Sequence, residues 1–340
     1  MSTTTASQLQ SDDVAAIDEL RDVYRRLRQE LSKIIVGQES VIEQLAICLF
    51  ARGHALLMGV PGLAKTLLVS RLAETMSLGF SRIQFTPDLM PMDITGTDIL
   101  QESGDGRRHF EFIKGPVFAN IVLADEINRA PSKTQAAMLE AMQEHRVTVV
   151  GRPYSLDPPF FVLATQNPVE QEGTYPLPEA QLDRFMFLIS VDYPTRSEEL
   201  EIARTTTGGS IPRLDHIIDG QTVQRFQELV RRVPVPQHIY EFAVDLVRRT
   251  RPGLKESPEW LKPLVSWGAG PRAVQYLILG AKSRAALTGS YMARLEDLMA
   301  VAEPVLTHRV LTTFAAESEG IHSKDVVRRL VEELNREQVR

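Results

Sequence analysis

A short loop at residues 59–66, with the sequence GVPGLAKT, constrains this chain more than any other stretch. It follows the apolar run 55–58, which predicts a buried strand, and precedes residues 67–73, which predict a helix with one apolar face. In such a unit the loop N–H groups and the helix N-terminus both point at an anion. The sequence therefore predicts a phosphate-binding loop. The residues expected to bind the nucleotide here are those of the loop and the residue that follows it: Gly59, Val60, Pro61, Gly62, Leu63, Ala64, Lys65, Thr66 and Leu67.

Two side chains of this loop have predicted roles in chemistry. Lys65 would reach the β- and γ-phosphates of a nucleotide, and the Thr66 hydroxyl would ligate Mg²⁺. The usual pattern has a second glycine before the lysine, where this chain has Ala64. Taken alone, the loop therefore also fits a glycine turn that leads into a helix with an exposed lysine.

A pair of carboxylates, Asp125 and Glu126, follows a second apolar run at residues 121–124. Ligands of open α/β sheets bind outside the carboxyl ends of the strands, so this pair should lie beside the phosphate loop. Asp125 would bind Mg²⁺ through water, and Glu126 would activate the attacking water. An acidic turn without chemistry is the alternative for the pair alone. The loop and the pair together, in this order on two apolar strands, favour a nucleotide hydrolase.

Periodicity predicts the fold class. Further apolar strands are expected at 80–85, 160–164 and 186–191, with helices at 14–31, 41–49 and 131–145. Glycine-containing turns predict two β-hairpins, near 97–112 and 147–156. Strands that alternate with helices imply an α/β core with a doubly wound parallel sheet.

Beyond Pro194 only helical periods are visible, at 223–230, 239–247, 273–287 and 295–310, so an all-α helical lid domain is expected after the core. The predicted division is a disordered tail and helix at 1–33, the α/β core at 34–193 and the lid at 194–340.

Composition restricts the class of protein. The 340 residues are 43% hydrophobic and 24% charged, and the net charge is −6, which argues against nucleic acid or an anionic membrane as partner. Cys48 is the single cysteine and suits a reducing compartment. No apolar run is long enough for a membrane helix, and residues 1–13 lack the order of a secretory signal, so a cytoplasmic location is expected.

Four motifs together resemble the MoxR family of AAA+ ATPases. They lie at residues 59–66, at 123–131 (LADEINRAP), at 164–168 (ATQNP) and at 179–185 (EAQLDRF). Gly270-Pro271-Arg272 extends the resemblance into the lid. Ala64 in the loop is itself typical of that family. The resemblance implies an ATPase with ATP and Mg²⁺ as its cofactors.

Two catalytic roles follow from this resemblance. Asn167 matches the first sensor residue, which orients the water or touches the γ-phosphate, and an Asn-Pro turn is the alternative. Arg184 matches the arginine finger, which a subunit supplies to the ATP of its neighbour, because charge on the γ-phosphoryl oxygens needs a fixed cation. For Arg184 the alternative is a surface ion pair with Asp183 or Glu179.

Two further assignments rest on shorter motifs. Arg272, which follows Gly270-Pro271 at the start of a lid helix, matches the second sensor, with a solvated first-turn arginine as the alternative. The segment 36–38 resembles the adenine-side box of these ATPases, although simple helix capping would use the same residues. That segment is Val36, Gly37 and Gln38.

The resemblance also implies an assembly and a task. The two hairpins match insertions of the helix-2-insert branch of AAA+ proteins and would face the central pore of a homo-oligomeric, hexameric ring; an outer surface is the alternative. ATP hydrolysis would drive chaperone-like remodelling or maturation of a separate partner protein, for instance one with a von Willebrand factor type A domain or a metal cofactor. Three alternatives remain: a magnesium-chelatase-like motor subunit, a DNA-translocating AAA+ ATPase and a non-hydrolysing nucleotide-gated scaffold.

Overall fold

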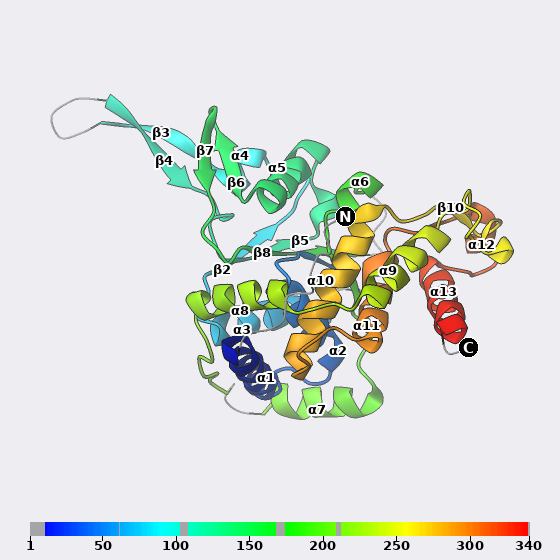
Figure 1. The fold of residues 1–340 in the computed structure, drawn as a ribbon. Helices are drawn as coiled ribbons and strands as arrows, with labels where there is room; N and C mark the ends of the chain where they lie inside the picture. The colour runs from blue at the N-terminus through cyan, green and yellow to red at the C-terminus, as the bar shows by residue number, and fades with distance from the viewer. Residues whose placement is uncertain (1–10, 61, 103–107, 168–173, 209–211, 339–340) are drawn as a thin grey trace, which may run out of the picture.

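A five-stranded parallel sheet forms the centre of the computed structural model, which describes residues 11–60, 62–102, 108–167, 174–208 and 212–338 (Figure 1). The strand order is β2-β5-β8-β1-β9, and all four neighbouring pairs are parallel. The strands are β1 (Ala55–Met58), β2 (Phe80–Gln84), β5 (Ile121–Asp125), β8 (Phe161–Gln166) and β9 (Phe187–Ser190). The predicted parallel sheet is confirmed.

Both faces of this sheet are buried. Along β1, Ala55 and Leu57 belong to one hydrophobic cluster, whereas Leu56 belongs to the other. The same alternation places Leu163 of β8 in the first cluster and Val162 in the second. Because successive side chains of a strand point to opposite faces, a strand covered on both sides is apolar throughout. This is why the strands appear in the sequence as continuous apolar runs.

Helices cover the two faces. The first cluster contains apolar side chains of α1, α2 and α3, and the second contains those of α4 and α5. These helices are α1 (Ser11–Leu31), α2 (Glu39–Phe50), α3 (Lys65–Thr75), α4 (Pro91–Thr95) and α5 (Ser132–Glu144). A short 3₁₀ helix, η1 (Ile127–Arg129), follows β5.

Two antiparallel hairpins extend from the end of the molecule that carries α4 and α5 (Figure 1). Strand β3 (Gly96–Glu102) pairs with β4 (Arg108–Lys114), and β6 (Arg146–Val149) pairs with β7 (Arg152–Ser155). The rings of Phe112 and Tyr154 stack with centroids 3.9 Å apart, so the two hairpins contact each other. Both lie where the sequence predicts a hairpin, although the glycine turn at 104–106 lies outside the described residues.

The C-terminal part is helical, as predicted. It comprises α7 (Arg196–Thr206), α8 (Gly220–Arg232), α9 (Gln237–Arg249), η2 (Glu259–Leu261), α10 (Pro271–Thr288), α11 (Leu295–Leu306), α12 (Phe314–Ser318) and α13 (Ser323–Gln338). One detail of the all-α prediction is wrong, because β10 (Val265–Trp267) and β11 (Leu311–Thr312) form a small antiparallel ladder. Strands of two or three residues are too short to produce a readable alternation.

Helix α1 packs on the rest of the molecule, with Ile17, Leu20 and Leu27 fully buried in the same cluster as α10. The segment predicted to be disordered, residues 1–11, lies outside the described residues except for Ser11, which begins α1. The unit boundaries at 33/34 and 193/194 stay predictions. Among the described residues, no helix is both long and apolar enough to cross a membrane.

Candidate nucleotide-binding site

A cleft of about 450 Å³ opens at the carboxyl ends of β1, β5 and β8. The loop after β1 and the start of α3 form one wall, and the ends of β5 and β8 form the other. The cleft is lined by Gly62, Leu63, Ala64, Lys65, Thr66, Leu67, Arg82, Asp125, Glu126, Thr165 and Asn167. The structure thus brings together the predicted phosphate loop, the two carboxylates and Asn167. Pro61 lies outside the described residues.

The loop geometry suits a phosphate. Gly62 has φ +86°, and a Cβ added there would meet no atom within 4 Å, so the space on that side is open. Ala64 also has a left-handed conformation, with φ 53°, at the N-cap of α3. A glycine would adopt this conformation without strain, whereas alanine does so at a cost of about 1 kcal/mol. A phosphate group suits the N-terminus of α3, because the first backbone N–H groups of a helix lack partners within the helix.

Lys65 bends back over the loop, where its Nζ donates to the carbonyl oxygen of Gly59 at 2.6 Å. Partial burial lowers the pKa of Lys65, and the nearby carboxylates of Asp125 and Glu126 oppose that shift. Its charged end is therefore already positioned inside the cleft, close to where phosphate oxygens would lie.

Asp125 is fixed by two neighbouring strands. Arg82 of β2 donates to its Oδ2 from Nε at 3.0 Å and from Nη2 at 2.7 Å, and the Thr165 hydroxyl of β8 donates to its Oδ1 at 2.6 Å. Both oxygens of the carboxylate therefore have hydrogen-bond donors that hold it in one orientation. Oxygen ligands held in this way are suitable for Mg²⁺.

Glu126 is oriented by different neighbours. Its N–H donates to the Thr165 hydroxyl at 2.8 Å, and its Oε2 accepts from Gln84 Nε2 at 2.8 Å. Arg129 Nη1 lies 3.1 Å from the same oxygen. The residue has φ 57°, a conformation that side-chain-bearing residues rarely adopt, and the contacts with Thr165, Gln84 and Arg129 support it.

Sequence reasoning missed Arg82, Gln84 and Thr165. Strand β2 was predicted, but its place beside β5 was not, and the observed register pairs Gln84 with Asp125. For Thr165 the available signal was a polar residue in the otherwise apolar and buried strand β8, whereas β2 has a single buried residue, Ile83, and gives no such signal. Without the strand order, that signal could not be connected to the carboxylates.

The predicted adenine-side segment touches the phosphate loop through one side chain. Gln38 Nε2 donates to the carbonyl oxygen of Leu63 at 3.2 Å. Its Oε1 is buried and has no hydrogen-bond partner within the part of the chain that the structure describes. Gly37 instead packs against Glu198 of α7, whose Oε1 would lie 2.2 Å from an added Cβ.

The other two predicted arginines lie elsewhere. Arg184 and Arg272 line a second cleft of about 230 Å³, together with His54, His145 and Tyr276 among others. Arg184 Nη1 donates to the carbonyl oxygen of Leu139 at 3.2 Å. Within one chain, therefore, the structure does not bring these two cations to the phosphate loop.

Asp183 is engaged by residues other than Arg184, contrary to the alternative interpretation of that arginine. Its Oδ2 pairs with Arg272 Nη1 at 2.6 Å, and its Oδ1 pairs with Arg309 Nε at 2.8 Å. Arg272, whose side chain is 39% exposed, is therefore ion-paired rather than simply solvated.

Comparison with known proteins supports the motif assignment. The chain is 43% identical to Chaperone MoxR1 of Mycobacterium tuberculosis over 303 residues, which span 89% of this chain and 79% of that protein. It is 32% identical to Protein MoxR of Methylorubrum extorquens, over 87% of this chain and 90% of the relative. The chain belongs to the MoxR family of AAA+ ATPases.

Two family models and a solved structure also match this MoxR-family chain. Residues 54–187 match the model of the ATPase family associated with various cellular activities, and residues 259–330 match the AAA lid domain. A solved structure from Cytophaga hutchinsonii, described as a candidate ATPase, superposes with a TM-score of 0.86 at 41% identity, covering 94% of this chain and 96% of that one. The protein is therefore an ATPase with a helical lid.

Proposed function

We propose that this MoxR-family protein hydrolyses ATP with Mg²⁺ in a homo-oligomeric ring, and that hydrolysis drives remodelling or maturation of a separate partner protein. The observation that carries the proposal is the division of the predicted machinery between two clefts. Lys65, Asp125 and Glu126 line one cleft, whereas Arg184 and Arg272 line the other. A site completed by a second subunit accounts for this division.

In the nucleotide cleft, some residues would bind ATP and Mg²⁺, and others would take part in the hydrolysis reaction. Thr66 and Asp125 would bind Mg²⁺, which when bound neutralises charge on the β- and γ-phosphoryl oxygens. Lys65 would move from the carbonyl oxygen of Gly59 to a phosphate oxygen. Glu126, oriented by its backbone contact with Thr165, would accept a proton from the attacking water. The buried Gln38 Oε1 would accept a hydrogen bond from the adenine amino group.

Asn167 would assist the same reaction. It directly follows β8, is 6% exposed and lines the cleft beside Thr165. An amide at this position would orient the attacking water or contact the γ-phosphate, as the first sensor residue does in the family that the sequence resembles.

The second cleft would face the neighbouring subunit. Arg184 and Arg272 would supply positive charge to the γ-phosphoryl group bound by that neighbour, where charge develops in the transition state. Both cations lie in one cleft, so a single docking event would deliver both. A hexamer and a cytoplasmic location are part of this proposal.

The hairpins would contact the partner protein. They carry exposed apolar side chains, with Leu100 54%, Phe110 68% and Val150 80% exposed. Exposed apolar residues grouped on projecting elements are typical of surfaces that bind other proteins. We place these hairpins at the pore of the ring. One relative is named a chaperone. We propose that the client of this chain is a protein with a von Willebrand factor type A domain or a metal cofactor.

Mixing two inactive variants tests the shared site. Glu126→Gln should retain ATP binding and lose most turnover, because an amide cannot accept the proton. Arg184→Ala should retain its own nucleotide site and lose roughly 10³-fold in turnover, as other arginine fingers do. In mixed rings, an intact Glu126 will meet an intact Arg184 from the next subunit, so activity should return.

Subunit exchange must first be shown with differently labelled proteins. Full activity of Arg184→Ala alone would refute the shared site. Exchange without recovery would also count against it, and titrating the ratio of the two variants against wild type would show whether a single inactive subunit silences the whole ring.

A further inference from the structure

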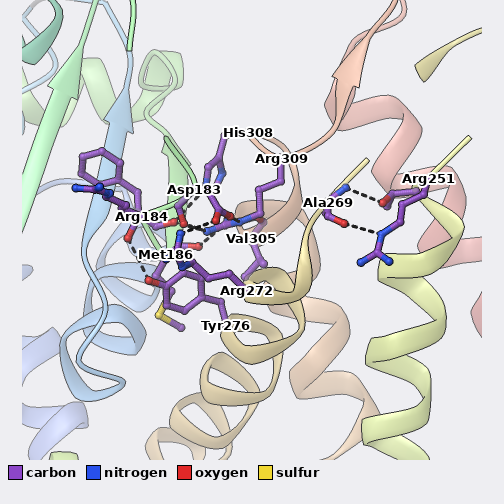
Figure 2. A network of polar contacts seen from close by, with 12 residues as sticks. Asp183, Arg184, Met186, Arg251, Ala269, Arg272, Tyr276, Val305, His308 and Arg309 are labelled. Atoms are coloured by element: carbon purple, nitrogen blue, oxygen red, sulfur yellow. Dashed lines mark hydrogen bonds and ion pairs between the residues drawn. The ribbon is translucent and has the colours of Figure 1, made fainter. Parts of the chain in front are cut away.

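The short segment that carries Arg184 is held by the lid through four consecutive carbonyl oxygens (Figure 2). Arg309 Nη2 donates to the carbonyl oxygens of Asp183 and Phe185 at 2.8 and 2.6 Å, and its Nη1 donates to that of Met186 at 3.3 Å. The Tyr276 hydroxyl of α10 donates to the carbonyl oxygen of Arg184 at 3.1 Å.

Arg309 is unusually well suited to this task. Only 5% of the residue is exposed, and its Nε donates to Asp183 Oδ1 at 2.8 Å. Its guanidinium lies 5.1 Å from the centroid of the Tyr276 ring, and its Nη1 also donates to the carbonyl oxygen of Val305. A buried cation is tolerated only when its charge and its N–H groups have partners, and here most partners belong to residues 183–186.

Asp183 extends the contact to a second cation. One carboxylate oxygen pairs with Arg309 and the other with Arg272. The backbone on either side of Arg184 is therefore held by one buried guanidinium, and the head group of Arg272 is linked to the same guanidinium through Asp183. Arg309 itself follows α11, 126 positions after Asp183 in the chain.

We propose that Arg309 is a positioning residue that, with Tyr276, fixes Arg184 and Arg272 for action on the nucleotide of the neighbouring subunit. The inference rests on the proposed shared site. An arginine side chain is long, so a small displacement of its backbone moves the guanidinium away from the γ-phosphoryl group. A misplacement of about 1 Å can cost roughly 100-fold in rate.

The test replaces Arg309 by lysine, which keeps the charge but cannot donate to several carbonyl oxygens at once. Arg309→Lys should lower kcat about 10- to 100-fold, while the Kd for ATP, measured with a fluorescent ATP analogue, stays within about twofold because the phosphate loop is unchanged. Arg251→Lys is the matched control, since Arg251 is a lid arginine that donates to the carbonyl oxygen of Ala269 at 2.9 Å, apart from the Arg184 segment (Figure 2). It should leave kcat unchanged.

A double variant separates positioning from a general loss of structure. Arg184→Ala combined with Arg309→Lys should lose less turnover than the product of the two separate losses, because part of the effect of Arg309 acts through Arg184 and only the part that acts through Arg272 remains. Arg309→Lys mixed with Glu126→Gln should regain turnover, as its own nucleotide cleft is intact. Tyr276→Phe removes one hydroxyl at the same segment and should lower kcat several-fold, which keeps the test valid if Arg309→Lys does not fold.

The outcomes distinguish the two proposals. Wild-type turnover of Arg309→Lys and Tyr276→Phe, with Arg184→Ala inactive, would overturn the positioning role alone. A fully multiplicative loss in the double variant would overturn it too, because Arg309 would then act independently of Arg184. Full activity of Arg184→Ala would instead overturn the shared site on which the inference rests.

Discussion

Replacing Thr165 by valine should weaken both the fold and the catalytic site, because one hydroxyl joins the two carboxylate residues. It donates to Asp125 Oδ1 at 2.6 Å and accepts from the Glu126 N–H at 2.8 Å, and Thr165 is 1% exposed. A hydrogen bond to a charged group contributes about 1.5–3 kcal/mol, and a buried N–H that loses its acceptor costs about 1–3 kcal/mol. Because both hydrogen bonds involve the same hydroxyl oxygen, their contributions are not fully additive. We therefore expect the free energy of unfolding to fall by about 2–4 kcal/mol.

The same Thr165→Val substitution should also lower turnover. Glu126 has a positive φ, and its N–H contact with Thr165 helps to maintain that conformation. Without the contact, the carboxylate should adopt several orientations, and kcat should fall by at least about tenfold. Steady-state phosphate release measures kcat, and urea denaturation followed by circular dichroism measures the change in stability.

Thr134→Val provides the matched control. Thr134 is 2% exposed, and its hydroxyl donates to the carbonyl oxygen of Leu89 at 2.7 Å, away from the cleft. It should lose stability by about 1–3 kcal/mol and retain wild-type kcat. If Thr165→Val kept wild-type turnover, or if both variants lost turnover equally, the role assigned to the Thr165 hydroxyl would be wrong.

Two further changes address nucleotide binding and pH. Lys65→Ala removes a charge-assisted phosphate contact of about 1.5–3 kcal/mol. Calorimetry on the folded variant should therefore show an ATP affinity at least about tenfold lower. Unchanged affinity would refute the assignment of residues 59–66 as the phosphate-binding loop. Burial lowers the pKa of His54 from 6.5 to about 4. The unfolded chain then binds a proton more readily, so stability present above pH 6.5 is lost as the pH falls towards 4, by up to about 3 kcal/mol. Between pH 6.5 and pH 4, the urea midpoint of His54→Gln should fall less steeply with decreasing pH than that of the wild type. If the two midpoints fell in parallel, His54 would not be the cause of the pH dependence.

The sequence alone was sufficient to predict most of the sheet. The apolar runs 55–58, 121–124, 160–164 and 186–191 correspond to β1, β5, β8 and β9 within two residues at either end. Their signal is strong because both faces of each strand are buried, which leaves few positions for polar residues. The phosphate loop and the carboxylate pair could be found for the same reason, since each directly follows such a strand.

Two helices of the C-terminal part were not predicted from the sequence. Helix α7 contains no buried residue, so it has no apolar period, and it was not predicted. Helix α13 was also missed, although Val326, Val327, Leu330 and Leu334 are buried at helical spacing and could have indicated it. Helix α7 therefore carries no apolar pattern in the sequence, whereas α13 does.

Contacts between distant segments could not be predicted. Arg82 and Gln84 reach the carboxylates only because β2 is the edge strand beside β5, and strand order depends on how all helices pack. Arg309 is a stronger example, because its partners lie 126 positions earlier and no motif surrounds it. A single sequence carries no information about such pairs until the fold brings them together.

The separation of the two clefts has a consequence for how subunits of the proposed ring would communicate. The loop at 59–66 is attached to β1 and α3 in the core, whereas Arg184 and Arg272 are both anchored through Asp183 to Arg309, which belongs to the lid. A reorientation of the lid would therefore move Arg272 with α10 and change how residues 183–186 are held, while the loop of the same subunit stays in place. The catalytic effect would appear at the nucleotide of the neighbour. In the proposed ring each lid would regulate hydrolysis in the adjacent subunit, and the Asp183–Arg309 pair would be the contact through which it does so.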